Sequence, residues 1–125
     1  MDVDRQWLCE RIVEETGDAV LFVDADGVIR LWNESAEQLF GYPHEEAVGS
    51  SLDIIVPEEF RRPHWAGFDA AVEDGATRSD DDSYATVPAL HADGDRITIQ
   101  TSGAQVVARD GEVVGVFNTI RRAEE

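Results

Sequence analysis

Residues 24–42 constrain the fold more than any other stretch of this chain, and they read DADGVIRLWNESAEQLFGY. Asp26-Gly27 supplies the positive φ angles of a tight hairpin turn, and apolar stretches typical of strands flank it. Asn33 can cap a helix, because its side-chain oxygen accepts a backbone N–H of the first helical turn. Gly41 can end that helix, because glycine adopts the left-handed conformation without strain. The stretch therefore predicts a hairpin that leads directly into a short helix.

The rest of the chain predicts two longer helices and three more strands. Apolar residues at helical spacing indicate an amphipathic helix at 3–15, before the first strand. Because proline disrupts a helix interior, we expect a turn at 58–61 and a main helix that begins near Pro63 and ends at Gly75. Glycine-containing turns separate three further predicted strands, at 84–91, 96–107 and 113–120. Five strands, with helices grouped between the second and the third, predict an α+β fold with one antiparallel sheet.

The chain carries a net charge of −17, from 27 acidic and 10 basic residues, and every basic residue is arginine. Because the acidic residues are spread along the chain, we interpret them as the surface of a protein adapted to high salt, where screening removes self-repulsion. A basic partner is the alternative interpretation. Nucleic acid is not expected as a partner, because binding a phosphate backbone requires a basic surface.

Length and composition predict one domain in the cytoplasm. A chain of 125 residues makes a single domain. No apolar run reaches the roughly 20 residues that span a bilayer, so direct membrane insertion is not expected. The N-terminus has acidic residues where a signal peptide has a basic cluster. One cysteine, Cys9, rules out an internal disulfide and fits a reducing compartment.

The motifs of the first half resemble the start of a PAS domain, the small sensory module of signalling proteins. The residues that carry this resemblance are Asp24, Gly27, Ile29, Asn33, Ala36, Phe40, Gly41, Tyr42, Glu45, Glu46 and Gly49. The resemblance extends from about Glu14 to Arg122 and implies a five-stranded antiparallel sheet, with helices packed on one face and an N-terminal flanking helix. We divide the chain into that flanking helix at 1–16, a PAS domain at 17–122 and the start of a linker at 123–125.

Strand alternation predicts which side chains face the helices, and many of these are small, which leaves room either for close packing or for a cavity. In the PAS family this position often holds a ligand pocket. His64 would lie on the face of the main helix that opposes the sheet. The candidate ligand-binding residues are Leu21, Val23, Phe60, His64, Phe68, Val87, Ile97, Ile99, Thr101 and Phe117.

His64 has three interpretations: a buried, hydrogen-bonded histidine, a polar contact to a small ligand, or an axial ligand to haem iron. The last follows from the segment ending in Arg61-Arg62-Pro63-His64, which resembles the helix of haem-binding PAS oxygen sensors. Those sensors carry an arginine where this chain has Ala70, and Arg96 is no clear match for their ligand-sensing arginine. No metal site is expected unless haem is bound.

The resemblance implies a non-enzymatic sensor that binds a small, mostly apolar, planar molecule, aromatic or heterocyclic, and passes a signal to a C-terminal effector domain. The whole protein would be a prokaryotic signal-transduction protein, such as a histidine kinase or transducer of a halophilic archaeon. Flavin–thiol chemistry is excluded, because no cysteine follows Cys9. Thr119 stands where many family members have an aspartate, which is a departure at the point of signal transfer. The alternative is a ligand-free module. In either case we expect a homodimer through the N-terminal helix.

Overall fold

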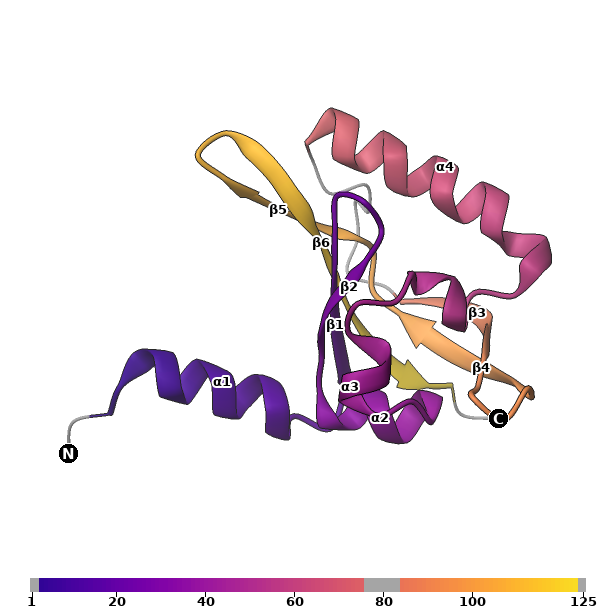
Figure 1. The fold of residues 1–125 in the computed structure, drawn as a ribbon, viewed down its shortest axis with the longest axis horizontal. Coiled ribbons are helices and arrows are strands. Elements are labelled where there is room, and N and C mark those ends of the chain that lie inside the picture. Colours follow the sequence, from indigo (N-terminus) through magenta and orange to yellow (C-terminus); the bar gives the residue numbers. More distant parts are fainter. Residues whose placement is uncertain (1–2, 76–83, 124–125) are drawn as a thin grey trace.

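The computed structural model describes residues 3–75 and 84–123 and has the predicted α+β architecture (Figure 1). One antiparallel sheet has the strand order β2-β1-β6-β4-β3, and β5 also pairs with β6. The elements are α1 (Arg5–Glu15), β1 (Ala19–Asp24), β2 (Ile29–Trp32), α2 (Glu34–Phe40), α3 (His44–Ala47), the 3₁₀ helix η1 (Leu52–Ile55), α4 (Glu58–Asp74), β3 (Ala85–Leu90), β4 (Arg96–Thr101), β5 (Gln105–Arg109) and β6 (Glu112–Arg122).

The hairpin and the caps of α2 form as their residue types predict. Gly27 has a φ of 84° in the turn between β1 and β2. The side chain of Asn33 accepts a hydrogen bond from the backbone N–H of Ala36, and Gly41 ends α2 with a φ of 84°. The Asn33 side chain also reaches outside its helix: its oxygen accepts the N–H of Val20 at 2.9 Å. This side chain is fully buried, so it ties α2 to the first strand as well as capping the helix.

The predicted start of the main helix is wrong. Helix α4 begins at Glu58, directly after Pro57, and Pro63 lies inside it. The first turn still closes, because the N–H of Phe60 donates to the carbonyl of Pro57 at 2.9 Å. Pro63 cannot donate to the carbonyl of Glu59, but both residues are exposed, so water can replace the missing hydrogen bond. An exposed position early in a helix tolerates a proline that a buried one would not.

The predicted strand at 96–107 is two strands, which gives six strands in place of the expected five. The chain leaves the ladder at Ser102 to Ala104 and resumes pairing as β5. β6 has 11 residues, long enough to pair with β5 in its first half and with β4 in its last residues. Because of this break, β4 and β5 both pair with the single long strand β6.

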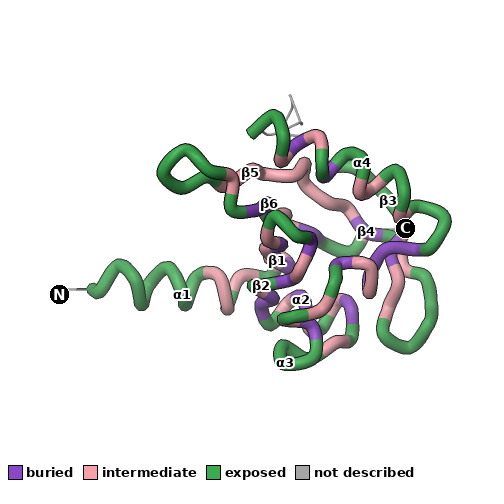
Figure 2. Tube along the Cα trace, turned by 45° about the horizontal axis from the view of Figure 1, so that its top comes forward, coloured by how far each residue is buried: buried purple, intermediate pink, exposed green. Residues whose placement is uncertain are grey.

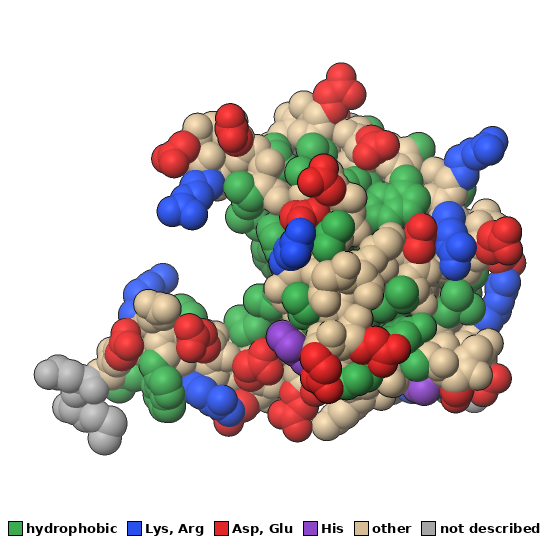
Figure 3. Space-filling view, viewed as in Figure 1, with side chains coloured by type: hydrophobic (Ala, Val, Ile, Leu, Met, Phe, Trp, Pro, Cys, Tyr) green, Lys and Arg blue, Asp and Glu red, His purple; other side chains and the backbone are tan. Residues whose placement is uncertain are grey.

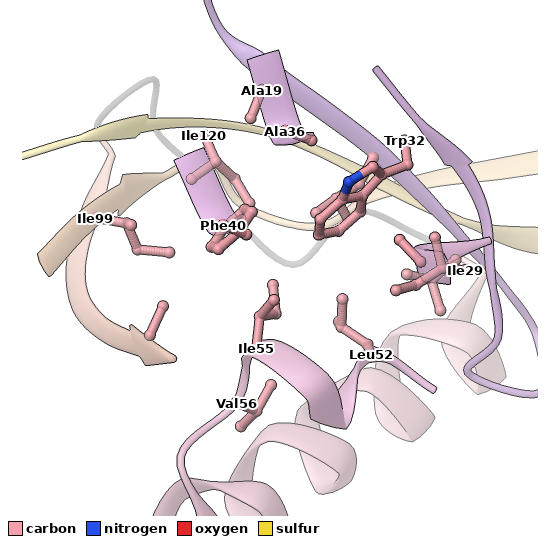
Figure 4. Packing of buried hydrophobic residues seen from close by; sticks show 14 of the residues in the cluster. Ala19, Ile29, Trp32, Ala36, Phe40, Leu52, Ile55, Val56, Ile99 and Ile120 are labelled. Atoms are coloured by element: carbon pink, nitrogen blue, oxygen red, sulfur yellow. The ribbon is translucent and has the colours of Figure 1, made fainter. Parts of the chain in front are cut away.

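The core lies between the sheet and the helices α2, α3 and η1. Its largest fully buried side chains include Trp32 and Phe40, whose ring centroids are 5.4 Å apart. Figure 4 shows Leu52 and Ile55 pointing from η1 toward these two rings. α1 is different, because none of its residues is buried, and it projects away from the body of the domain (Figure 2). Within the described residues, no helix combines the length and the apolar character needed to cross a bilayer.

Candidate functional site

A cavity of about 330 Å³ lies between the sheet and the segment formed by η1 and the first turns of α4. It is partly open to solvent, and its lining residues Phe60 and Val87 are 42% and 37% exposed. Six of the ten predicted ligand-binding residues line it: Leu21, Phe60, His64, Val87, Ile99 and Thr101. Nine lining residues are not among the predicted ligand-binding residues: Leu52, Ile55, Val56, Pro57, Pro63, Pro88, Ala89, Asn118 and Ile120. Most of the lining is aliphatic, so the cavity offers an apolar environment with a few polar groups.

Four predicted residues lie outside the cavity lining. Val23 is fully buried in the core, and Phe68 is also buried there. Ile97 is partly buried and packs against the same core cluster. Phe117 is 36% exposed, because it lies on the opposite face of the sheet. Three of the four residues therefore fill the core and one faces outward, and none of them borders the cavity.

The placement of Phe117 corrects the predicted face of β6. Leu21 stands opposite Asn118 and Phe22 stands opposite Phe117, and directly paired residues share a face. Asn118 and Ile120 therefore face the helices, and Phe117 faces outward. A Cβ on Gly115 would lie 2.1 Å from the carbonyl oxygen of Val23, which explains why a residue without a side chain stands there. The register between β1 and β6 determines which side chains of β6 face the helices. The alternation of residue types within β6 does not reveal this by itself.

The polar groups on the sheet wall are engaged with one another and with the strand break. The amide nitrogen of Asn118 donates to the carbonyl of Ser102 at 2.9 Å and lies 3.4 Å from the hydroxyl of Thr101. That hydroxyl in turn donates to the carbonyl of Ser102 at 3.1 Å. These hydrogen bonds stabilise the point where the chain leaves β4. They also engage the donors of both side chains, with the carbonyl of Ser102 and with each other.

His64 lies on the helical wall, and its Nδ1 is enclosed without a hydrogen-bond partner among the described residues. Burial lowers the pKa of His64, and the nearby carboxylate of Asp53 opposes this only in part. The His64 ring packs edge-on against Trp65, with ring centroids 4.7 Å apart. Trp65 in turn donates from Nε1 to the carboxylate of Asp53 at 2.7 Å. The helical wall thus carries a neutral imidazole that is held in place by its neighbours.

Two arginines fix the start of α4 but do not line the cavity. Arg61 donates from Nε to the carbonyl of Val56 at 3.0 Å and so joins α4 to η1. Arg96 pairs with Glu59 at 2.6 Å and joins β4 to α4. This hydrogen bond lowers the pKa of the Glu59 carboxyl. Arg96 is therefore a link between the two walls, consistent with its lack of a match to a ligand-sensing arginine.

The arrangement does not fit haem held by His64. A metal-ligating histidine normally donates its other ring N–H to a carbonyl, carboxylate or water, which fixes the ring and raises its basicity. If Nε2 bound iron, Nδ1 would be that donor, and among the described residues it has no acceptor. Ala70 also stands where the resemblance to haem sensors would require an arginine.

Comparison with known proteins identifies the family. A family model described as "PAS fold" matches residues 8–123. The chain belongs to the PAS family. This PAS domain is similar in structure to the PAS domain of a protein from Colwellia psychrerythraea, with a TM-score of 0.83 and 21% identity over 96% of this chain and 98% of that one.

Two curated proteins are similar in sequence to part of the PAS domain. It is 38% identical over 53 residues to the sensor protein FixL of Bradyrhizobium diazoefficiens, and 39% identical over 46 residues to the oxygen sensor protein DosP of Escherichia coli. These matches cover 42% and 37% of this chain. They span only 10% and 6% of the relatives' own lengths, so the similarity concerns a short segment and not the whole proteins.

Proposed function

We propose that this PAS domain is a non-enzymatic sensory module that binds a small, mainly apolar, planar molecule between the sheet and α4. The cavity of about 330 Å³ is the observation that carries the proposal. Its volume lies at the lower end of the roughly 300–1,000 Å³ of small-molecule sites. It is about twice the roughly 150 Å³ of an apolar cavity that binds benzene. A substituted single ring or a fused pair of rings therefore matches the available space.

The lining supports a route for the signal. It joins residues of η1 and α4 to residues of β1, β3, β4 and β6, so an occupant would contact both walls at once. β6 leads to the C-terminal end of the domain. Thr119 replaces the usual aspartate. Its hydroxyl lies 2.8 Å from the hydroxyl of Tyr84, and its backbone N–H donates to the hydroxyl of Ser102 at 3.0 Å. We propose that ligand binding changes this strand and so reaches a C-terminal effector, such as a kinase or transducer.

We also propose that the domain forms a homodimer through α1. Three large apolar side chains of α1, Trp7, Leu8 and Ile12, are exposed by 41–59%, and Val3, just before the helix, is exposed by 48%. Figure 3 shows apolar side chains on this projecting helix, and acidic side chains distributed over the rest of the same face of the molecule. Pairing of two such helices would bury the apolar stripe. Light scattering of wild type and a Trp7→Glu variant would test it, and a monomeric wild type would contradict it.

The ligand proposal is tested by native mass spectrometry of the purified domain. We expect a small molecule to remain bound to wild type and to be lost in Ala89→Leu, because Ala89 is buried and borders the cavity. A matched variant, Ala66→Leu, places the same side chain at an exposed position of α4 and should retain the molecule. A wild-type domain that neither retains nor takes up small aromatic molecules would favour the ligand-free alternative. Haem reconstitution should yield no Soret band that depends on His64.

A further inference from the structure

We infer that His64 donates a hydrogen bond from Nε2 to the occupant of the cavity, so that the ligand is a neutral, flat molecule with a hydrogen-bond acceptor, such as a carbonyl oxygen or a ring nitrogen. This inference rests on the proposed function, because it assigns the ligand class of the same site. The proposed function specifies the shape and apolar character of the ligand, and this inference adds a hydrogen-bond acceptor.

The position of the proton follows from the surroundings of the ring. Neutral imidazole carries one N–H and one acceptor nitrogen. Nδ1 of His64 is enclosed and has no partner within 3–75 and 84–123, so an N–H there would be a buried donor without an acceptor. The proton therefore belongs on Nε2. That nitrogen is neither enclosed nor hydrogen-bonded to any described residue, so it remains a free donor on a ring that lines the cavity.

The other lining groups limit the charge and chemistry of the ligand. Asn118 donates to the carbonyl of Ser102 and to the hydroxyl of Thr101, and that hydroxyl donates to the carbonyl of Ser102, which leaves His64 as the side-chain donor available on the opposite wall. The lining contains neither an arginine nor a carboxylate. A buried charge without a partner is strongly unfavourable, so a ligand with an anionic or cationic group inside this lining is disfavoured. A neutral acceptor satisfies Nε2–H without introducing a charge.

The test compares two molecules of the same shape. Acetophenone has a carbonyl oxygen where α-methylstyrene has a CH₂ group, and the affinities of both are measured by titration calorimetry. The preference for acetophenone is the ratio of the two dissociation constants. Comparing this ratio between wild type and His64→Phe cancels the different hydration of the two molecules, as in a double-mutant cycle. His44→Phe is the matched control, since His44 is exposed and lies outside the cavity.

We expect the preference for acetophenone to fall about threefold to tenfold in His64→Phe, the range of one neutral hydrogen bond, and to stay unchanged in His44→Phe. An unchanged preference in His64→Phe, with both molecules still bound, overturns the inference and leaves the proposed function standing. Failure of both molecules to bind wild type overturns the proposed function as well.

A second measurement uses wild type alone and does not depend on the folding of a variant. Long-range ¹H–¹⁵N NMR spectra distinguish the two neutral tautomers of His64. We expect the proton on Nε2, with a shift of that nitrogen on addition of acetophenone and a smaller one on addition of α-methylstyrene. A proton on Nδ1, or equal shifts with both molecules, would overturn the inference.

Discussion

Asn33 connects three elements through one buried side chain, so its removal should be unusually costly. Its nitrogen Nδ2 donates to the carbonyls of Val13 at 2.7 Å and Asp18 at 3.0 Å. Its oxygen Oδ1 accepts the N–H of Val20 at 2.9 Å and of Ala36 at 3.0 Å. Asn33→Ala would therefore lose the cap of α2 together with the links to β1 and to the end of α1.

The expected loss is about 4 kcal/mol, from four hydrogen bonds worth about 1 kcal/mol each. Part of this loss is the cap itself, which is worth about 0.5–2 kcal/mol. For a domain of this size, the change corresponds to a fall in Tm of roughly 15 °C. Urea denaturation followed by tryptophan fluorescence, at constant salt concentration, would measure the free energy of unfolding.

Ser51→Ala is the matched control for this prediction. Ser51 also caps a helical segment, since its hydroxyl accepts the N–H of Asp53 at 3.1 Å, but its side chain is exposed and makes one such bond. We expect this variant to lose only about 0.5–1 kcal/mol. If Asn33→Ala lost no more than Ser51→Ala, the buried links to β1 and α1 would not contribute to stability and the reasoning would be refuted.

Three further predictions concern packing, pH and salt. Gly115→Ala should lower the free energy of unfolding by more than about 3 kcal/mol, because its Cβ would lie 2.1 Å from the carbonyl oxygen of Val23. Gly67→Ala in α4 meets no atom within 4 Å and should raise the free energy of unfolding by about 0.5–1 kcal/mol. Equal effects of the two variants in chemical denaturation would contradict this. The folded-state pKa of His64 lies below 6.5, so the free energy of unfolding of wild type should fall as pH drops from about 6.5 toward that lower pKa. His64→Phe should lack this pH-dependent loss. Identical pH profiles of the two proteins would count against a neutral His64. With a net charge of −17, the Tm should rise from dilute buffer to molar salt, and identical melts would remove the high-salt interpretation.

Local chemistry made much of the fold predictable from sequence. The cap that Asn33 forms with Ala36 and the C-cap at Gly41 are local to α2, so these residue types were sufficient to place the helix. The inward-facing residues of β3 and β4 followed from alternation, and the pairing of Val87 with Ile99 confirms that they share a face. Such features depend on neighbours in sequence, which is why the amino acids alone reveal them.

Features that depend on distant partners were not predictable in the same way. The face of β6 follows from its register with β1, so Phe117 was assigned inward and Asn118 was missed. The split of the strand after Thr101 depends on hydrogen bonds from Asn118. Pro63 was expected to start a helix, because proline disrupts a helix interior. The sequence does not show that this position is exposed, where water can replace the missing hydrogen bond. The sequence of η1, Leu52–Ile55, is mostly aliphatic, but only the fold places these residues against the cavity.

The central claim is that an apolar cavity lies between the sheet and α4, and xenon tests it directly, because xenon binds in apolar cavities. Methyl ¹³C spectra of the wild-type domain would be recorded under increasing xenon pressure. We predict saturable shifts for Leu21, Ile55, Ile99 and Ile120, which line the cavity, and none for Ile29, which is buried elsewhere in the core. Shifts that are linear and uniform across all methyl groups would contradict the existence of the cavity.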